Sequence, residues 1–209
     1  SASGYDELDP RHVKLSCELI IKPLLYVCNL SFKEGVFPEE LKIAKVVPIF
    51  KAGDSMKVTN YRPVSVLCVM SKVLERLMYN RLLNFVEKFN ILYDLQFGFR
   101  KEHSTFMALM VVVDKIIKSL QNGEFTIGLY LDFSKAFDTI DHEILFMKLY
   151  HYGIRGVSLS WFKSYMSNRS EFVSYYGDAS ATRRMKCGVP QGSILGPLLL
   201  IWGNTCTIY

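Results

Sequence analysis

One apolar run that ends abruptly at a carboxylate constrains the fold of this chain more than any other segment. Residues 125–131 read FTIGLYL, and Asp132 follows them directly. A continuous apolar run of this length is typical of a strand buried on both faces, because a strand with one wet face would alternate apolar and polar residues. We therefore predict a buried strand at 125–131 that carries Asp132 at its carboxyl end.

Helical periodicity dominates the rest of the chain, and no internal repeat interrupts it, which favours a single unit of mixed helices and strands. We expect Ser71, Ser104 and Asp141 to cap helices, and Pro23 to kink or split the first one. The expected helices cover residues 11–34, 71–89, 104–120, 141–151 and 161–165, and further strands are expected at 44–50 and 171–176.

The uncharged stretch from Cys187 to Tyr209 predicts a buried helix. Glycine, proline and polar residues interrupt it, so no run reaches the roughly 20 apolar residues that a membrane span needs. The five cysteines are scattered without a CxxC pair, which indicates neither a disulfide framework nor a zinc site. The polar, acidic first ten residues do not resemble a signal peptide, and we expect an intracellular protein. Because the chain starts with Ser1 and stops in an apolar stretch, we interpret it as a fragment.

Positive charge is concentrated in residues 42–101, which carry 11 basic and 4 acidic side chains. Such a segment is a candidate surface for phosphate groups. The alternative is a solvated helix face, since Lys72, Arg76 and Arg81 fall within a helical pattern.

Asp132 is the residue best placed for chemistry. A carboxylate held rigidly at the end of a buried strand can bind a hard cation beside a triphosphate. Asp138 and Asp141 follow closely, but the first is expected in a structural turn and the second at a helix cap.

Several motifs, taken together, resemble the fingers and palm motifs of the reverse transcriptases of non-LTR retrotransposons, in the style of the jockey, CR1 and Rex elements. The segment LDFSKAFDTIDH resembles the first palm motif of that family. The matching segments are VVPIFKAGD (46–54), NYRPVSVLCVMSKVLERL (60–77), QFGFRKEHST (96–105), LDFSKAFDTIDH (131–142), WFKSYMSNRSEFV (161–173) and GVPQGSILGPLL (188–199).

This resemblance implies an α+β right-hand polymerase fold with fingers and an incomplete palm. Its parts would be an N-terminal helical extension at 1–41, fingers at 42–124, a partial palm at 125–199 and a divergent tail at 200–209. The family's YADD or FADD hairpin, which follows the PQG motif and supplies further carboxylates, has no counterpart in this sequence, nor has the thumb. Asp178 is the last acidic residue.

The resemblance also implies roles for single residues in nucleotidyl transfer with two Mg²⁺ ions. Asp132 would be the catalytic metal ligand, helped by the backbone carbonyl of Phe133. The Phe137 ring would lie under the sugar as a steric gate, and an ordinary core position is its alternative. The remaining nucleotide contacts would come from Lys51, Arg62, Gln191 and Gly192, with Gly188 permitting close backbone approach, while Arg100 and Lys101 would contact template or primer.

Asp132 is the only carboxylate of the family's metal site that the resemblance assigns to this sequence. We therefore expect these 209 residues to lack polymerase activity, because one carboxylate cannot hold two cations about 3.5–4 Å apart. We also expect exposed apolar surface around Leu195 to Trp202 and poor solubility. The partners implied are an RNA template, a DNA primer and a deoxynucleoside triphosphate, without a membrane, in the nucleus and cytoplasm. The alternatives are a non-catalytic module that binds RNA or template-primer, and the product of a decayed element.

Overall fold

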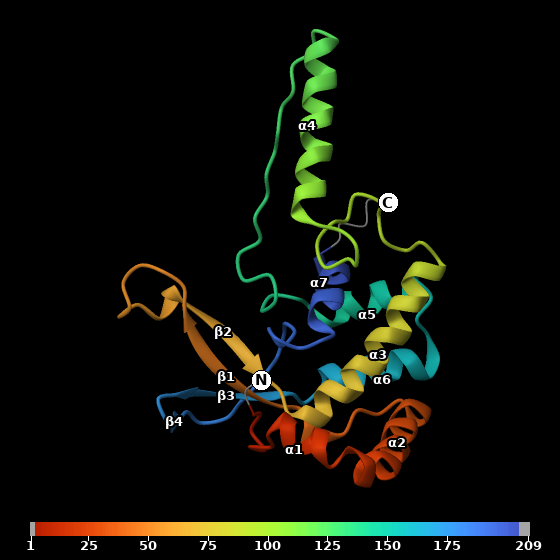
Figure 1. Ribbon diagram of the computed structural model, residues 1–209, viewed down its shortest axis with the longest axis vertical. Coiled ribbons are helices and arrows are strands. Elements are labelled where there is room, and N and C mark those ends of the chain that lie inside the picture. The colour runs from red at the N-terminus through yellow and green to blue at the C-terminus, as the bar shows by residue number, and fades with distance from the viewer. Residues whose placement is uncertain (1–2, 205–209) are drawn as a thin grey trace. The chain divides into compact units, whose positions relative to one another are not determined.

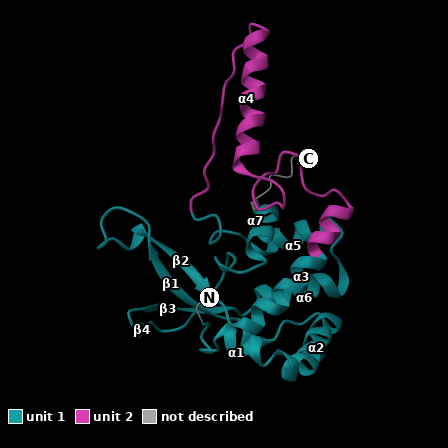
Figure 2. Cartoon of the chain, in the orientation of Figure 1, with its two compact units in different colours: residues 1–81, 135–209 teal, residues 82–134 magenta. Residues whose placement is uncertain are grey.

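The computed structural model describes residues 3–204, and the chain divides into two compact units (Figure 2). Unit 1 comprises residues 1–81 and 135–209, and unit 2 comprises residues 82–134. Helix α3 (Val69–Lys88) begins in unit 1 and ends in unit 2, which also holds α4 (Thr105–Gln121). Unit 1 contains α1 (Pro10–Leu15), α2 (Cys17–Glu34), β1 (Ile43–Phe50), β2 (Tyr61–Val66), α5 (His142–His151), α6 (Gly156–Met166), β3 (Ser170–Tyr175), β4 (Asp178–Ala179), β5 (Arg183–Arg184), α7 (Gly196–Asn204) and two 3-10 turns, Glu39–Leu41 and Val58–Asn60.

The sheet of unit 1 is mixed and has the strand order β2-β1-β3-β4, with β5 also pairing with β3 (Figure 1). Strands β1 and β2 form an antiparallel hairpin, whereas β1 and β3 are parallel. The strands expected at 44–50 and 171–176 are therefore confirmed as β1 and β3. The long connection between β1 and β3 contains helices, as a parallel crossover requires.

Aromatic side chains form the centre of the helical layer of unit 1. Trp161 of α6 is fully buried, stacks on Tyr165 and meets Phe37 edge to face. Its indole nitrogen donates a hydrogen bond of 2.9 Å to the hydroxyl of Ser31, which ties α6 to α2. Burying aromatic side chains of this size contributes strongly to stability, so this cluster anchors the helices beside the sheet.

Two expected helix boundaries are wrong. The break in the first helix comes at Ser16, which separates α1 from α2, whereas Pro23 lies inside α2 and does not split it. A proline inside a helix removes one N–H donor, yet α2 continues through Pro23 and packs on α6. Ser71 is not a cap, because α3 already begins at Val69. The caps expected at Ser104 and Asp141 are confirmed, since their side chains accept hydrogen bonds from the N–H groups of Met107 and Ile144.

The buried strand predicted at 125–131 is wrong. These residues, in unit 2, form neither strand nor helix, and Phe125 and Ile127 are 99% and 94% exposed. A strand is stabilised by ladder hydrogen bonds and by burial of its faces, and no described strand pairs with this segment. The apolar pattern predicts burial, whereas the structure leaves these side chains exposed.

The helix expected near the carboxyl end is confirmed as α7, but the expectation of exposed apolar surface around it is wrong. Leu195, Leu198, Leu199 and Trp202 are buried, because α7 packs on α5. Of the tail at 200–209, residues 205–209 lie outside the described part. Within residues 3–204, every helix is too short or too polar to cross a lipid bilayer.

Candidate functional site

The segment 188–193, which we call the PQG loop, is held between strand β2 and the turn that precedes α5. Gly188 donates its N–H to Ile140 O at 2.8 Å, and Val189 donates to Phe137 O at 2.7 Å. On the other side, Ser65 of β2 donates to Gln191 O at 2.7 Å. These main-chain hydrogen bonds fix the loop on both sides, so its side chains project from a rigid base.

Two glycines allow this close approach. Gly188 has φ +80°, and a Cβ there would lie 2.7 Å from the carbonyl oxygen of Phe137. Gly192 has φ +118°, and its Cβ would lie 2.6 Å from the carbonyl oxygen of Ser65. Both positions therefore combine a backbone conformation that favours glycine with a lack of space for any side chain.

The pleat of the β1–β2 hairpin places Arg62 on the same sheet face as Val64, and the PQG loop lies beside the same strand. Arg62 pairs with Ile49 and Val64 pairs with Val47, so these four side chains share one face. The PQG loop lies along the edge of β2, where Gln191 O accepts from the N–H of Ser65, and a Cβ on Gly192 would lie 3.6 Å from Cγ1 of Val64. Lys51 follows Ile49 by two residues, and its N–H donates to Asn60 O at the tip of the hairpin.

Phe137 and Gln191 complete this group of side chains. Both are half-buried, and the Phe137 ring lies 3.7 Å from the position that a Cβ of Gly196 would take. Of the residues expected to contact a nucleotide, Gln191 and Gly192 lie in the PQG loop, and the carbonyl of Phe137 is bonded to that loop through Val189. Arg62 lies on β2, the strand that the loop flanks. Lys51 lies at the hairpin tip, where it is exposed.

Glu75 is a buried glutamate that the sequence analysis did not single out. It is hydrogen-bonded to the main chain directly after the PQG loop. Glu75 of α3 accepts hydrogen bonds from the N–H of Ile194 at 2.7 Å and from the hydroxyl of Tyr165 at 3.0 Å. Ser71 Oγ lies 3.4 Å from the same carboxylate. The carboxylate thus connects α3, α6 and the end of the loop. The signal in the sequence was an acidic residue inside the apolar stripe of a helix.

The surroundings of Glu75 explain its electrostatics. Burial raises the pKa of the Glu75 carboxyl, and the Arg169 guanidinium and the N–H of Ile194 act against that rise. Arg169 is itself buried, donates to Tyr165 O and lies 4.7 Å from the Tyr165 ring centre. Its Nε and Nη2 atoms find no hydrogen-bond partner among residues 3–204. Burying two charged groups is costly, and the hydrogen bonds that the Glu75 carboxylate accepts offset part of that cost.

The remaining expected site residues belong to unit 2. Asp132 and Phe133 are exposed and lie in the irregular segment that follows residues 125–131. Arg100 donates to Tyr93 O at 3.3 Å, and Lys101 forms an exposed ion pair with Glu102. Within the described part of the chain, no three His, Cys, Asp or Glu side chains gather as a metal site would require.

Comparison with known proteins identifies the family. Residues 49–202 match the family model described as reverse transcriptase (RNA-dependent DNA polymerase). This chain belongs to the reverse transcriptase family. The matched range includes the β1–β2 hairpin tip, the segment around Phe137 and the whole PQG loop. The site described above thus lies within the part of the chain that matches the family model.

The relatives of this reverse transcriptase domain are polymerases of mobile elements. It is 35% identical over 199 residues to the RNA-directed DNA polymerase from mobile element jockey of Drosophila melanogaster, a match that covers 95% of this chain and 22% of the relative. It is 34% identical to the probable RNA-directed DNA polymerase from transposon BS of the same organism, covering 87% and 20%, and 33% identical to that from transposon X-element, covering 95% and 22%. The chain thus spans about a fifth of these relatives, and the non-LTR type expected from its motifs is confirmed.

Proposed function

We propose that this chain forms the fingers and part of the palm of an RNA-directed DNA polymerase, and that it binds the incoming deoxynucleoside triphosphate beside an RNA template and a DNA primer. The observation that carries the proposal is the seating of the PQG loop along the edge of β2, the strand that also bears Arg62. In this proposal residues 42–124 are fingers, residues 125–199 are partial palm, residues 1–41 are a helical extension and residues 200–209 are a divergent tail.

The side chains in this group suit the parts of a nucleotide. The guanidinium of Arg62 presents a planar set of donors to phosphate oxygens, and Lys51 adds a point charge at the hairpin tip. Gln191 offers an amide to the base, and the half-buried Phe137 ring offers an apolar wall beneath the sugar, where a 2′-hydroxyl would clash. Arg100 and Lys101 in unit 2 are proposed to contact the template or primer backbone.

Reverse transcriptases typically use divalent cations, and the described residues fit such a site poorly. Mg²⁺ prefers six oxygen ligands, of which carboxylates are the strongest. Asp132 with the carbonyl of Phe133 offers two ligating groups, and no cluster of three ligating His, Cys, Asp or Glu side chains exists among residues 3–204. Since no acidic residue follows Asp178 in the sequence, we propose that the 209 residues alone bind substrates without joining them.

Nucleotide labelling tests the binding part of this proposal. Ultraviolet cross-linking of radiolabelled dTTP, in the presence of a poly(rA) template and an oligo(dT) primer, is expected to label the chain. The double variant Lys51→Ala with Arg62→Ala should lose about tenfold of that labelling, because two charge-assisted contacts to phosphate are removed. The matched control is Lys14→Ala with Lys33→Ala, which removes two exposed cations from the α1–α2 region. Equal labelling of both double variants would contradict the assigned site.

Primer extension tests the catalytic part. With Mg²⁺ and the same template-primer, we expect no extension by this chain or by Asp132→Ala. Extension that disappears in Asp132→Ala would show that further carboxylates complete the metal site. Salt-dependent binding of the duplex without extension favours a binding module, since contacts to phosphates weaken as salt concentration rises. A chain without a cooperative thermal transition would favour the decayed element instead.

A further inference from the structure

His142 is the first residue of α5, and its imidazole ring contacts the start of the PQG loop. Its Nε2 atom lies 2.8 Å from the carbonyl oxygen of Gly188. The first turn of α5 is fixed by its cap, because the Asp141 carboxylate accepts from the N–H of Ile144. The ring is half-buried and lies beside Phe146, with 6.2 Å between the ring centres. His142 is thus held against the loop by its own helix.

The contact defines which ring nitrogen carries hydrogen. A main-chain carbonyl oxygen only accepts hydrogen bonds, so Nε2 of His142 must donate to Gly188 O. Nε2 therefore bears a hydrogen whether the ring is neutral or charged. A ring nitrogen that bears hydrogen has no free lone pair, so this atom neither binds a metal ion nor accepts a proton. At Nε2, His142 therefore holds the loop and takes no part in proton transfer.

Gly188 is buried and needs partners for both of its main-chain groups. Its N–H donates to Ile140 O at 2.8 Å, and its carbonyl accepts from the ring of His142. The two peptide planes that flank Gly188 are thus both bonded to residues 140–142. This double attachment fixes the backbone angles of Gly188 relative to the start of α5.

The two residues after Gly188 are stiff, so they carry its orientation to Gln191. Glycine rotates more freely than any other residue, and Gly188 is therefore where the loop would bend. The ring of Pro190 fixes its own φ, and Val189 is restricted to extended conformations because it precedes a proline. Any change in the orientation of Gly188 should therefore displace Gln191 with it.

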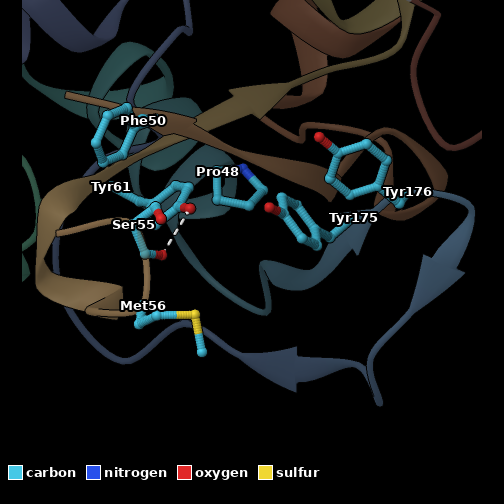
Figure 3. A pocket seen from close by; sticks show the side chains of 7 residues that line it. All are labelled: Pro48, Phe50, Ser55, Met56, Tyr61, Tyr175 and Tyr176. Atoms are coloured by element: carbon cyan, nitrogen blue, oxygen red, sulfur yellow. Dashed lines mark hydrogen bonds between the residues drawn. The ribbon is translucent and has the colours of Figure 1, made fainter. Parts of the chain in front are cut away.

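The other side of the loop is held independently. Gln191 O accepts from the N–H of Ser65 on β2. Strand β2 is itself fixed at its beginning, where the Tyr61 hydroxyl donates to Ser55 O at 2.9 Å (Figure 3). The Tyr61 ring also lies 5.4 Å from the ring of Phe50, measured between centres. Loosening the start of the loop should therefore leave its attachment to β2 in place.

We propose that His142 is a positioning residue for the nucleotide site. Its hydrogen bond to Gly188 sets the direction of the PQG loop, and so the separation between the Gln191 amide and the Phe137 ring. The inference rests on the proposed function, in which these two side chains contact the base and the sugar. The bond from Val189 to Phe137 O joins the same two segments through the main chain, and His142 adds a side-chain attachment one residue earlier in the loop.

Labelling by dTTP, with the poly(rA) template and the oligo(dT) primer, tests this role. His142→Phe keeps an aromatic ring and removes the donor. It should need about tenfold more dTTP for half-maximal labelling, because tenfold corresponds to about 1.4 kcal/mol, the scale of one hydrogen bond. His142→Gln places an amide N–H group as many bonds from Cα as Nε2 and should be labelled like the wild type. His12→Phe, which removes an exposed histidine from α1, is the matched control and should leave labelling unchanged.

A second measurement separates positioning from a general loss of stability. Ribothymidine triphosphate differs from dTTP only in its 2′-hydroxyl, which the Phe137 ring is proposed to exclude. A variant that is merely less stable is labelled less by both nucleotides alike, whereas a displaced loop should reduce the preference for dTTP by about fivefold. We expect this reduction in His142→Phe and not in His142→Gln. His142→Asn carries the same amide on a shorter side chain that does not reach Gly188 O, so it should behave like His142→Phe.

Circular dichroism and a thermal melt establish that each variant is folded, and amide exchange follows the loop without any nucleotide. The N–H groups of Gly188 and Val189 should exchange faster in His142→Phe than in the wild type or in His142→Gln. Equal labelling and equal nucleotide preference in all these variants would overturn the inference and leave the proposed function intact. A wild type that dTTP does not label would reject the proposed function and the positioning role with it. Equal exchange rates in His142→Phe and His142→Gln would reject the loop contact itself.

Discussion

Replacing Glu75 by alanine is expected to lower the free energy of unfolding by about 3 kcal/mol, since one buried and one partly buried donor lose their acceptor at about 1–3 kcal/mol each. The donors are the N–H of Ile194 and the hydroxyl of Tyr165. Arg169 would also lose the carboxylate that offsets its buried charge. The measurement is a urea melt at neutral pH, followed by circular dichroism.

The control is Glu87→Ala on the same helix, where the side chain is exposed and a change within about 0.5 kcal/mol is expected. The double variant Glu75→Leu with Arg169→Met should recover much of the stability, because replacing both buried polar partners with apolar side chains is often neutral. Amide exchange at Ile194 should accelerate in Glu75→Ala, since that N–H loses its partner. A loss equal to that of Glu87→Ala would contradict the supporting role assigned to Glu75.

The local sequence patterns of this chain were sufficient for most helices and for two strands. The serine and aspartate caps at Ser104 and Asp141 were predicted correctly because a cap depends on the chemistry of two or three neighbouring residues. Strand β1 could be recognised from its own apolar run and the turn residues after it. Features that depend on contacts within a few residues are thus accessible from sequence.

Residues 125–131 show where such patterns fail. The run FTIGLYL has the composition of a buried strand, yet its residues are exposed and unpaired with any described strand. An apolar composition favours burial of a segment. A strand, however, forms only when a neighbouring strand provides the main-chain hydrogen bonds. The opposite error occurred at Leu195 to Trp202. We expected exposed apolar surface there, whereas most of these side chains are buried and α7 packs on α5.

The candidate site was accessible in part. The family resemblance pointed to Phe137, Gln191, Gly192 and Arg62. In the structure the PQG loop is bonded to Phe137 O and to Ser65 of β2, and the role of these residues in binding a nucleotide stays a prediction. Glu75 was missed because its partners are 90 and 119 residues away in the chain. A local sequence pattern gives no information on partners that far apart in the chain.

Replacing Gly188 by alanine is expected to destabilise the fold by about 3 kcal/mol, the sum of a left-handed backbone cost of about 1–2 kcal/mol and an overpacking cost of about 1–3 kcal/mol. A Cβ at this position would lie 2.7–2.9 Å from the main-chain atoms Phe137 O, Asp138 Cα and Asp138 C. Main-chain atoms cannot rotate away as a side chain could, so the turn before α5 or the PQG loop must shift. A chemical melt gives the loss of stability, and dTTP labelling should fall with it, because Phe137 and Gln191 lie on the two segments that are forced apart.

Gly177→Ala separates the two costs. Gly177 has φ +95°, close to that of Gly188, but a Cβ there would meet no atom within 4 Å. The free energy of unfolding of Gly177→Ala should therefore fall only by the backbone cost of about 1–2 kcal/mol, and its dTTP labelling should stay unchanged. The difference between the two variants measures the contact between the PQG loop and residues 137–138. If both lose the same stability, that contact is looser than the geometry shows, and the Phe137 ring would no longer be fixed relative to Gln191.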